Sequence, residues 1–198
     1  MRRSREVLVV RDAGYWVFAA LWIGWALYWF LAARQVKPIA RRESVASRLS
    51  HVLPLTVAAA LMMNPNLRIP GMNRVLVAHT PASFAIGVVL TVAGLWLAVW
   101  ARRILGANWS AIVTVKQDHA LITTGPYAWV RHPIYTGLLL ALAGTAIAIG
   151  QVRAALGFVI ALLAILHKTR IEERVMVEQF GDVYRAYRAR VPRLIPFL

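Results

Sequence analysis

Two apolar stretches in the second half of the chain decide the fold: PIYTGLLLALAGTAIAIG (residues 133–150) and AALGFVIALLAIL (residues 154–166). Neither contains a charged side chain, and only Gln151, Val152 and Arg153 separate them. A helix of about 20 apolar residues crosses the hydrocarbon core of a bilayer. We therefore interpret the pair as two membrane-spanning helices joined by a tight turn.

Three further apolar stretches precede this hairpin. Gly14–Ala33 is uncharged over its whole length, and Pro81–Ala101 is closed by two arginines where lipid headgroups would lie. The stretch between residues 48 and 68 is weaker because a histidine, two prolines and an asparagine interrupt it, so it either spans at a tilt or only dips into the bilayer. The sequence thus predicts an all-α integral membrane protein with about five transmembrane helices and a cytoplasmic C-terminal helical tail.

The composition agrees with a membrane location. The chain has 198 residues, of which 60% are hydrophobic, with a net charge of +15 and a mean hydropathy of +0.59. A nucleic-acid-binding protein would need a polar folded surface to display its cations, and the apolar stretches leave too little polar chain for one. The absence of cysteine excludes disulfides, thiolate zinc sites and cysteine nucleophiles. We treat residues 1–198 as a single membrane domain.

Positive charges are distributed unequally between the two sides of the membrane. If all five stretches span, sixteen of the 23 Lys and Arg residues lie on one side and seven on the other. Lys and Arg are retained on the cytoplasmic side during insertion. If the weaker stretch does not span, the split becomes fifteen against eight. Both versions make residues 102–132 and the segment after residue 166 cytoplasmic.

The start of the fourth span carries the polar pattern most typical of a ligand site. Pro133 fits the first turn of a helix, so His132 lies at the cap. Helix starts offer unpaired N–H groups and a partial positive charge, which Arg131 and His132 reinforce. Tyr135 lies on the same helical face, and Gly137 would let another backbone or a flat ligand approach closely. The group predicts a site for an anionic moiety such as a carboxylate, although each residue alone would more simply be a headgroup anchor.

The tail after the last span supplies carboxylates close to the membrane. Unpaired charge is costly there, so a functional role for Glu172 and Glu173 is at least as well supported as a solvated face. For Arg174 we expect a solvated face with weak ion pairs. Apolar side chains then recur at i, i+3, i+4 and i+7, which predicts a tail helix packed on the membrane body; they are Phe180, Val183, Tyr184 and Tyr187.

The order and spacing of these residues resemble those of the isoprenylcysteine carboxyl methyltransferase family and, more broadly, of phospholipid N-methyltransferases. The pattern covers about the C-terminal half of the chain. It consists of H-x-L-I-T-x-G-P-Y from His119, V-R-H-P-x-Y-x-G from Val130, the Glu172–Glu173 pair, and V-P-R-x-I-P from Val191. The resemblance implies a helical membrane enzyme with a cytoplasm-facing pocket for S-adenosylmethionine and a lipophilic substrate that enters from the bilayer. Residues 1–101 would then form spans on the acceptor side, and residues 102–198 the cofactor-binding and catalytic half.

Carried over to this chain, the resemblance implies a set of site residues. The cofactor-binding positions are His119, Gly125, Tyr127, His132, Tyr135, Gly137, Glu172 and Glu173. The catalytic positions, near the transferring methyl group or the acceptor, are Arg131, Arg170 and Glu172. The cofactor's carboxylate suits the helix start at His132, and its ammonium suits a glutamate. We expect no metal, because the five histidines lack ligand-like spacing.

The methyl acceptor stays open at this stage. The resemblance favours carboxyl O-methylation of an isoprenylcysteine-like substrate, with phospholipid amines, small thiols and other hydrophobic acids as alternatives. A sterol-type reductase with a nicotinamide cofactor is a second enzyme class, although the chain is short for one. A small membrane carrier or channel is the non-enzymatic alternative, but the middles of the spans contain no ionisable residue. The expected partners are therefore a lipophilic or lipidated substrate and membrane lipids.

Overall fold

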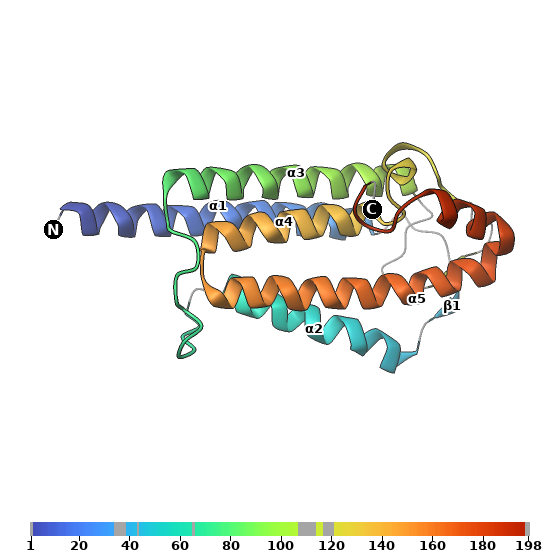
Figure 1. Cartoon of the computed structure of the whole chain (residues 1–198), viewed down its shortest axis with the longest axis horizontal. Helices are drawn as coiled ribbons and strands as arrows, with labels where there is room; N and C mark the ends of the chain where they lie inside the picture. The colour runs from blue at the N-terminus through green and yellow to red at the C-terminus, as the bar shows by residue number, and fades with distance from the viewer. Residues whose placement is uncertain are drawn as a thin grey trace.

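The fold is a bundle of long helices that lie side by side. The computed structural model describes residues 2–33, 39–42, 44–64, 66–106, 114–116 and 121–196. In chain order its elements are α1 (Arg2–Ala32), β1 (Ile39–Arg42), α2 (Val45–Met63), α3 (Pro81–Leu105), β2 (Thr114–Lys116), the 3-10 turn η2 (Gly125–Ala128), α4 (Pro133–Ile149) and α5 (Val152–Arg190). Figure 1 shows α3 beside α4, and α5 beside α2. An antiparallel ladder of β1 and β2, which the sequence did not predict, is the one sheet among these residues.

Within the described residues, four helices are long and apolar enough to cross a membrane. Their candidate spans are Gly14–Ala32, Val45–Met63, Pro81–Leu105 and Val152–Arg190, and α4 is a shorter apolar helix of 17 residues. The weak second stretch of the sequence is thus a full helix of 19 residues in spite of its internal proline. The predicted all-α integral membrane class is confirmed, with four long spans and one shorter apolar helix.

The packing of α3 on α4 depends on glycines. A Cβ atom added to Gly137 would lie 2.5 Å from the carbonyl oxygen of Gly94, and one added to Gly144 would lie 2.5 Å from that of Gly87. No larger side chain fits such spacings, so the two backbones pack directly, as small residues allow in membrane helices. Between the glycines the buried Thr91 hydroxyl donates a hydrogen bond to the carbonyl of Ala141 at 3.1 Å. This contact fixes where the start of α4 lies.

The helix α5 extends well beyond a bilayer. Its 39 residues would form a straight helix of roughly 58 Å, about twice the thickness of the hydrocarbon core. The uncharged residues 154–166 therefore lie in the membrane, and the charged remainder projects from it. At Gly181 the backbone φ is 54°, a left-handed conformation that glycine adopts without strain. The chain bends there, and residues 182–196 fold back toward α4 (Figure 1). We call these residues the folded-back tail, or the tail, and the part of α5 before Gly181 remains α5.

The bend corrects the predicted tail helix. Tyr184 and Tyr187 are buried as expected, but Val183 is 66% exposed. The spacing rule assumed one continuous helix from Phe180 onward, and the non-helical Gly181 resets the direction in which the later side chains point. Of the four side chains, Tyr184 and Tyr187 are buried and Phe180 is half-buried, so Val183 is the one that the bend turns toward the outside.

A buried arginine lies at the end of the bundle that contains the α4–α5 turn, which we call the far end. Arg153 is 7% exposed, and its guanidinium donates hydrogen bonds to the carbonyls of Leu61 (2.6 Å) and Asn64 (3.1 Å) and to the Gln151 side chain (2.6 Å). The last carbonyls of a helix have no partner within it. Arg153 therefore caps the C-terminal end of α2 and joins it to α5.

The opposite end, the site end, gathers the loops that carry the sequence motifs. The end of α1, the start of α2, the end of α3 and the start of α4 all lie there in Figure 1, together with the folded-back tail. The β1–β2 ladder joins two of the connecting segments at this end. The arrangement agrees with the version of the topology in which five helical segments alternate in direction.

Candidate active site

His132 lies between two adjacent glutamates at the site end. Its Nδ1 atom is 3.5 Å from Glu172 Oε2, and its Nε2 atom is 3.3 Å from Glu173 Oε1. Pro133 begins α4 directly after it, as the sequence predicted, so the imidazole is held at the helix cap. The two glutamates are neighbours on α5, yet their environments differ.

Glu173 is fully engaged with cations. Arg131 contacts Glu173 Oε1 through both Nε and Nη2 at 2.8 Å, and Arg193 Nη2 contacts Glu173 Oε2 at 3.1 Å. With His132 as the third cation, both carboxylate oxygens are occupied, and the side chain is only 4% exposed. Glu173 therefore joins α5, the start of α4 and the tail, and has no oxygen left over for a ligand.

Glu172 is more open. The Tyr135 hydroxyl donates a hydrogen bond of 2.5 Å to Glu172 Oε1, and the Lys168 ammonium lies 4.0 Å from the same oxygen. The Glu172 side chain is 22% exposed, against 4% for Glu173. Lys168 also lies over the Tyr135 ring, with its nitrogen 5.6 Å from the ring centre. A carboxylate and an ammonium are thus held side by side at a partly accessible position.

The three central groups fix one another's protonation. Burial alone would lower the pKa of His132, but its contacts with Glu172 and Glu173 outweigh burial and raise that pKa above the usual 6.5. Burial alone would raise the pKa of Glu173, but His132, Arg131 and Arg193 lower it to about 2. The imidazolium form of His132 is therefore favoured between two ionised carboxylates.

Residues 191–194 form a C-terminal strap that crosses the start of α4. Strap carbonyls accept hydrogen bonds from the backbone N–H groups of Arg131 (2.8 Å) and His132 (3.1 Å) and from the Thr136 hydroxyl (2.7 Å). The Arg131 side chain also donates to the carbonyls of Val191 and Arg188. These two N–H groups belong to the helix start that we expected to bind a ligand carboxylate, and the strap occupies them instead.

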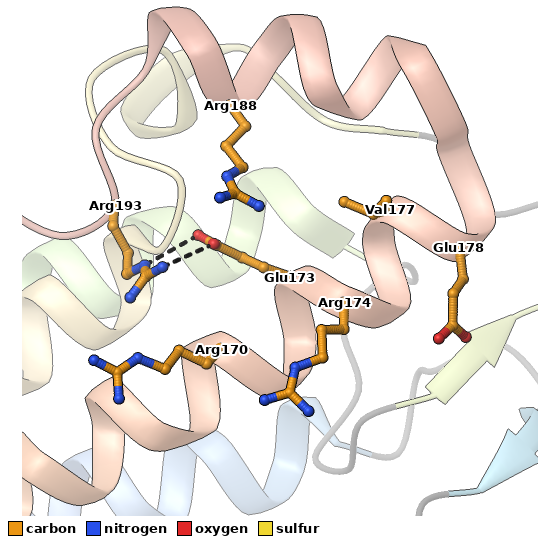
Figure 2. A pocket seen from close by; sticks show the side chains of 7 residues that line it. All are labelled: Arg170, Glu173, Arg174, Val177, Glu178, Arg188 and Arg193. Carbon is orange, nitrogen blue, oxygen red and sulfur yellow. Dashed lines mark hydrogen bonds and ion pairs between the residues drawn. The ribbon is translucent and has the colours of Figure 1, made fainter.

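An arginine-lined cavity of about 450 Å³ lies between α5 and the folded-back tail. Figure 2 shows Arg188 and Arg193 extending from the tail toward Glu173, with Arg170 and Arg174 on α5. The full lining is Arg170, Glu173, Arg174, Val177, Glu178, Arg188 and Arg193. We call this space the arginine cavity.

Several residues predicted for the cofactor site lie outside the cluster around His132. The ring of Tyr127 is buried against Ala101 and Ile134, and its carbonyl accepts a 2.6 Å hydrogen bond from the Tyr187 hydroxyl. Gly137 faces α3, so the close approach that its small size permits is that of a backbone.

Of the remaining predicted positions, Gly125 has a φ of 60°, begins η2 and lies beside Ile104. His119 lies outside the described residues. The structure brings together Arg131, His132, Tyr135, Glu172 and Glu173, with Arg170 on the wall of the adjoining cavity.

The sequence reading missed four residues of this region. The sequence analysis gave no role to Lys168, which lies four residues before Glu172 and whose side chain is only 13% exposed. Arg174 is exposed as expected, but it also lines the arginine cavity. The bend at Gly181 brings Arg188 and Arg193 to the site. The glycine is the only sign of this bend in the sequence.

The comparison with known proteins bears on this arrangement directly. Residues 86–178 match the model of the Isoprenylcysteine carboxyl methyltransferase (ICMT) family. The resemblance to the ICMT family that the motifs indicated is confirmed. The matched region runs from α3 through α4 into the charged part of α5 and contains His132, Tyr135, Glu172 and Glu173.

Individual relatives give the same result. A protein-S-isoprenylcysteine O-methyltransferase of Schizosaccharomyces pombe is 38% identical over 96 residues, which are 47% of this chain and 41% of that protein. The Homo sapiens protein of the same name is 31% identical over 115 residues, or 57% of this chain and 40% of its own length. The chain thus spans less than half the length of these relatives.

A solved structure described as the eukaryotic intramembrane Ras methyltransferase ICMT overlaps 77% of this chain and 52% of its own chain. Its TM-score is 0.49 and its sequence identity is 26%.

Proposed function

We propose that the chain is an S-adenosylmethionine-dependent membrane methyltransferase that methylates the carboxylate of a lipophilic, isoprenylcysteine-like acceptor. The observation that carries this proposal is the ICMT family match over residues 86–178, since it contains five members of the cluster: Arg131, His132, Tyr135, Glu172 and Glu173. The relatives' name specifies both the oxygen that receives the methyl group and the class of acceptor.

The cluster fits the amino-acid end of the cofactor. S-adenosylmethionine carries an ammonium and a carboxylate on the same carbon, and Glu172 and Lys168 offer the opposite charges 4.0 Å apart. The partial exposure of Glu172 leaves one side of its carboxylate reachable. Glu173 is surrounded by cations, so we assign it to holding the site together rather than to contacting the cofactor.

The chemistry makes few demands on the protein. When bound, the cofactor supplies an electrophilic methyl group, which an acceptor carboxylate oxygen takes as the carbon–sulfur bond breaks and its electron pair stays on sulfur. A carboxylate needs no deprotonation, so the chain has to supply no general base at neutral pH. Its contribution is orientation and exclusion of water: Tyr135 fixes the carboxylate of Glu172, and the strap covers the start of α4.

Of the two arginines assigned to the acceptor, the geometry favours Arg170. The guanidinium of Arg131 is already bound to Glu173 and to the strap carbonyls of Val191 and Arg188. Arg170 lines the arginine cavity next to Glu173. We therefore assign Arg131 to positioning and Arg170 to orienting the acceptor.

The site end faces the cytoplasm in this proposal, and the acceptor enters from the bilayer. The sequence count supports this orientation, because sixteen of the 23 Lys and Arg residues belong to the segments that five alternating spans assign to this side, and such residues are retained in the cytoplasm during insertion. Single cysteines at Gln117 and Ala189, in a chain that has none, should resist an impermeant thiol reagent in intact cells and react after lysis. Labelling of either cysteine in intact cells would contradict this orientation.

Cofactor binding and methyl transfer test the function directly. Titration calorimetry of the purified protein in detergent should detect S-adenosylmethionine, and transfer of a radiolabelled methyl group to N-acetyl-S-farnesylcysteine should follow. Glu172→Gln removes a charge from a charge-assisted contact of roughly 1.5–3 kcal/mol, so cofactor affinity should fall about tenfold or more.

Arg103→Gln is the matched control because it also removes one charge at the site end, from an exposed residue of α3 outside the cluster. Its cofactor affinity should equal that of the unchanged chain. Absence of cofactor binding in the unchanged chain would refute the proposed function, and normal binding by Glu172→Gln would refute the assignment of Glu172.

A further inference from the structure

The arginine cavity contains more positive charge than its own acids balance. Four arginines and two glutamates line it, and one of the glutamates, Glu173, also neutralises Arg131 and His132 behind the cavity wall. Among the described residues, no hydrogen bond or ion pair joins the guanidinium groups of Arg170, Arg174 or Arg188 to a partner. The cavity thus has a positive potential and unused donors.

The spacing of these arginines is unfavourable without a ligand. Arg170 and Arg174 are four residues apart on α5, where like charges lie next to each other and destabilise a helix. Arg188 faces them from the tail across the cavity (Figure 2). An anion between the three would convert mutual repulsion into charge-assisted hydrogen bonds, which guanidinium groups form readily with carboxylates.

The cofactor is a poor occupant of this cavity. S-adenosylmethionine carries a sulfonium and an ammonium against one carboxylate, so its net charge is positive. Adjacent residues on a helix point about 100° apart. Glu172 and Glu173 share His132 between them, but otherwise Glu172 contacts Tyr135 and Lys168, whereas Glu173 borders the cavity. The side of the pair at Glu172 therefore suits the zwitterionic end of the cofactor, and the side at Glu173 suits an anion.

A second cavity continues the first along the tail. It has a volume of about 340 Å³, shares Val177 and Arg188 with the arginine cavity, and adds Arg185 and Ala189. Arg185 already pairs with Asp182 at 2.6 Å, so the positive charge that this second cavity offers is that of Arg188. Together with Arg170 and Arg174 of the first cavity, more guanidinium groups face this space than one carboxylate needs, so it can accommodate further negative charge beside the group that is methylated.

We infer that the arginine cavity binds the anionic end of the acceptor and selects acceptors by the charge next to the methylated carboxylate, with acidic flanking groups preferred to neutral and neutral to basic. This inference rests on the proposed function and names the substrate class within it: a lipophilic acid with acidic or uncharged surroundings. Cationic neighbours, as in an amine or a basic peptide, would face Arg174 and Arg188 at close range.

Three acceptors on one scaffold test the charge preference. S-farnesylcysteine would carry on its amino group a succinyl cap (acidic), an acetyl cap (neutral) or a β-alanyl cap (basic). Methyl transfer by the purified full chain should show a kcat/KM that falls about tenfold from the succinyl to the β-alanyl compound, the size of one charge-assisted contact. Arg174→Gln and Arg188→Gln should each reduce this ratio severalfold while cofactor affinity stays unchanged.

Arg190→Gln is the matched control. Arg190 lies on the same tail helix, is exposed, donates to the carbonyl of Ala186 in its own helix, and lines neither cavity. It should keep the full ratio between the three acceptors. Equal kcat/KM for all three compounds, or an equal loss of the ratio in Arg190→Gln, would overturn the inference.

Two further measurements separate the alternatives. Binding of the three compounds without cofactor, followed by tryptophan fluorescence, tests the cavity even if methyl transfer fails, so loss of the proposed function and loss of this inference give different results.

Nanodiscs of phosphatidylcholine with and without phosphatidylglycerol test a lipid headgroup as the anion. If Arg174→Gln and Arg188→Gln changed only the response to phosphatidylglycerol and left acceptor binding intact, the acceptor assignment would be overturned.

Discussion

The two ends of the bundle bury charge in different ways. At the far end, the hydrogen-bond acceptors of Arg153 within the described chain are neutral oxygen atoms of α2, the following residue and Gln151. At the site end, Glu173 is surrounded by the charged groups of Arg131, His132 and Arg193. A charge held by neutral dipoles caps a helix and has no titrating partner. A charge held by other charges depends on each of them. The site end is therefore the half of the molecule that is more sensitive to the loss of a single charged side chain and to pH.

The largest expected effect comes from breaking the charged cluster. Glu173→Gln leaves Arg131, His132 and Arg193 without their common counter-charge, and removal of one partner from a buried ion pair destabilises by about 3–5 kcal/mol. We expect a loss of this size in the free energy of unfolding, measured by denaturant titration in mixed micelles. A loss below about 1 kcal/mol, the range of exposed pairs, would show that Glu173 does not hold the three segments together.

A smaller effect is expected at the far end. Arg153→Met keeps the length of the side chain but removes the donors to the carbonyls of Leu61 and Asn64, and an unsatisfied buried acceptor costs about 1–3 kcal/mol. Hydrogen exchange should increase locally in the last turn of α2, while cofactor affinity at the site end should not change. A change in cofactor affinity would mean that the two ends are coupled, contrary to this comparison.

The smallest effect is a pH dependence confined to the site end. The pKa of His132 is raised in the folded protein, so its contribution to stability is complete below its unfolded value of about 6.5 and is lost as pH rises through the folded value. Glu173, with a pKa of about 2 against 4.5, contributes above pH 4.5 and loses that contribution as pH falls toward 2.

Unfolding temperatures would test this expectation. Between about pH 6 and about pH 9, the unfolding temperature should decrease in the unchanged chain and be less pH-dependent in His132→Gln, because the titrating group is absent. Arg153→Met should keep the pH dependence of the unchanged chain, since the oxygens that accept hydrogen bonds from Arg153 do not titrate in this range. Identical pH curves for His132→Gln and the unchanged chain would contradict the role given to His132.

Most of the fold was predictable because membrane spans are defined by local composition. The uncharged stretches 133–150 and 154–166 determined the α4–α5 hairpin, and Pro133 marked the start of α4 as predicted. The bend at Gly181 was not predictable by the periodicity rule, which takes the helix as continuous. The β1–β2 ladder pairs segments more than 70 residues apart, and no local pattern specifies such a pairing.

The site was predictable in its members but not in their roles. Tyr135, His132 and the glutamate pair were expected near one another, and the structure brings them into contact. The partners that occupy Glu173 and Arg131 come from the tail about 20 and 60 residues away, so the sequence could not show that these two side chains are already engaged. For the same reason Arg174 was expected on a solvated face, whereas it lines the arginine cavity, and the proposed variant Arg174→Gln tests that cavity as a binding surface.

The strap over the start of α4 also sets an order in time. Residues 191–194 follow the last span, so they leave the ribosome only after all of the helices have been synthesised, and proteins fold from the N-terminal side during synthesis. Until then the N–H groups of Arg131 and His132 lack the carbonyls that they bind in the finished molecule, and Glu173 lacks Arg193. The inserted helices can therefore assemble as a bundle before the site is complete, and synthesis of residues 191–194 then supplies the contacts that complete it.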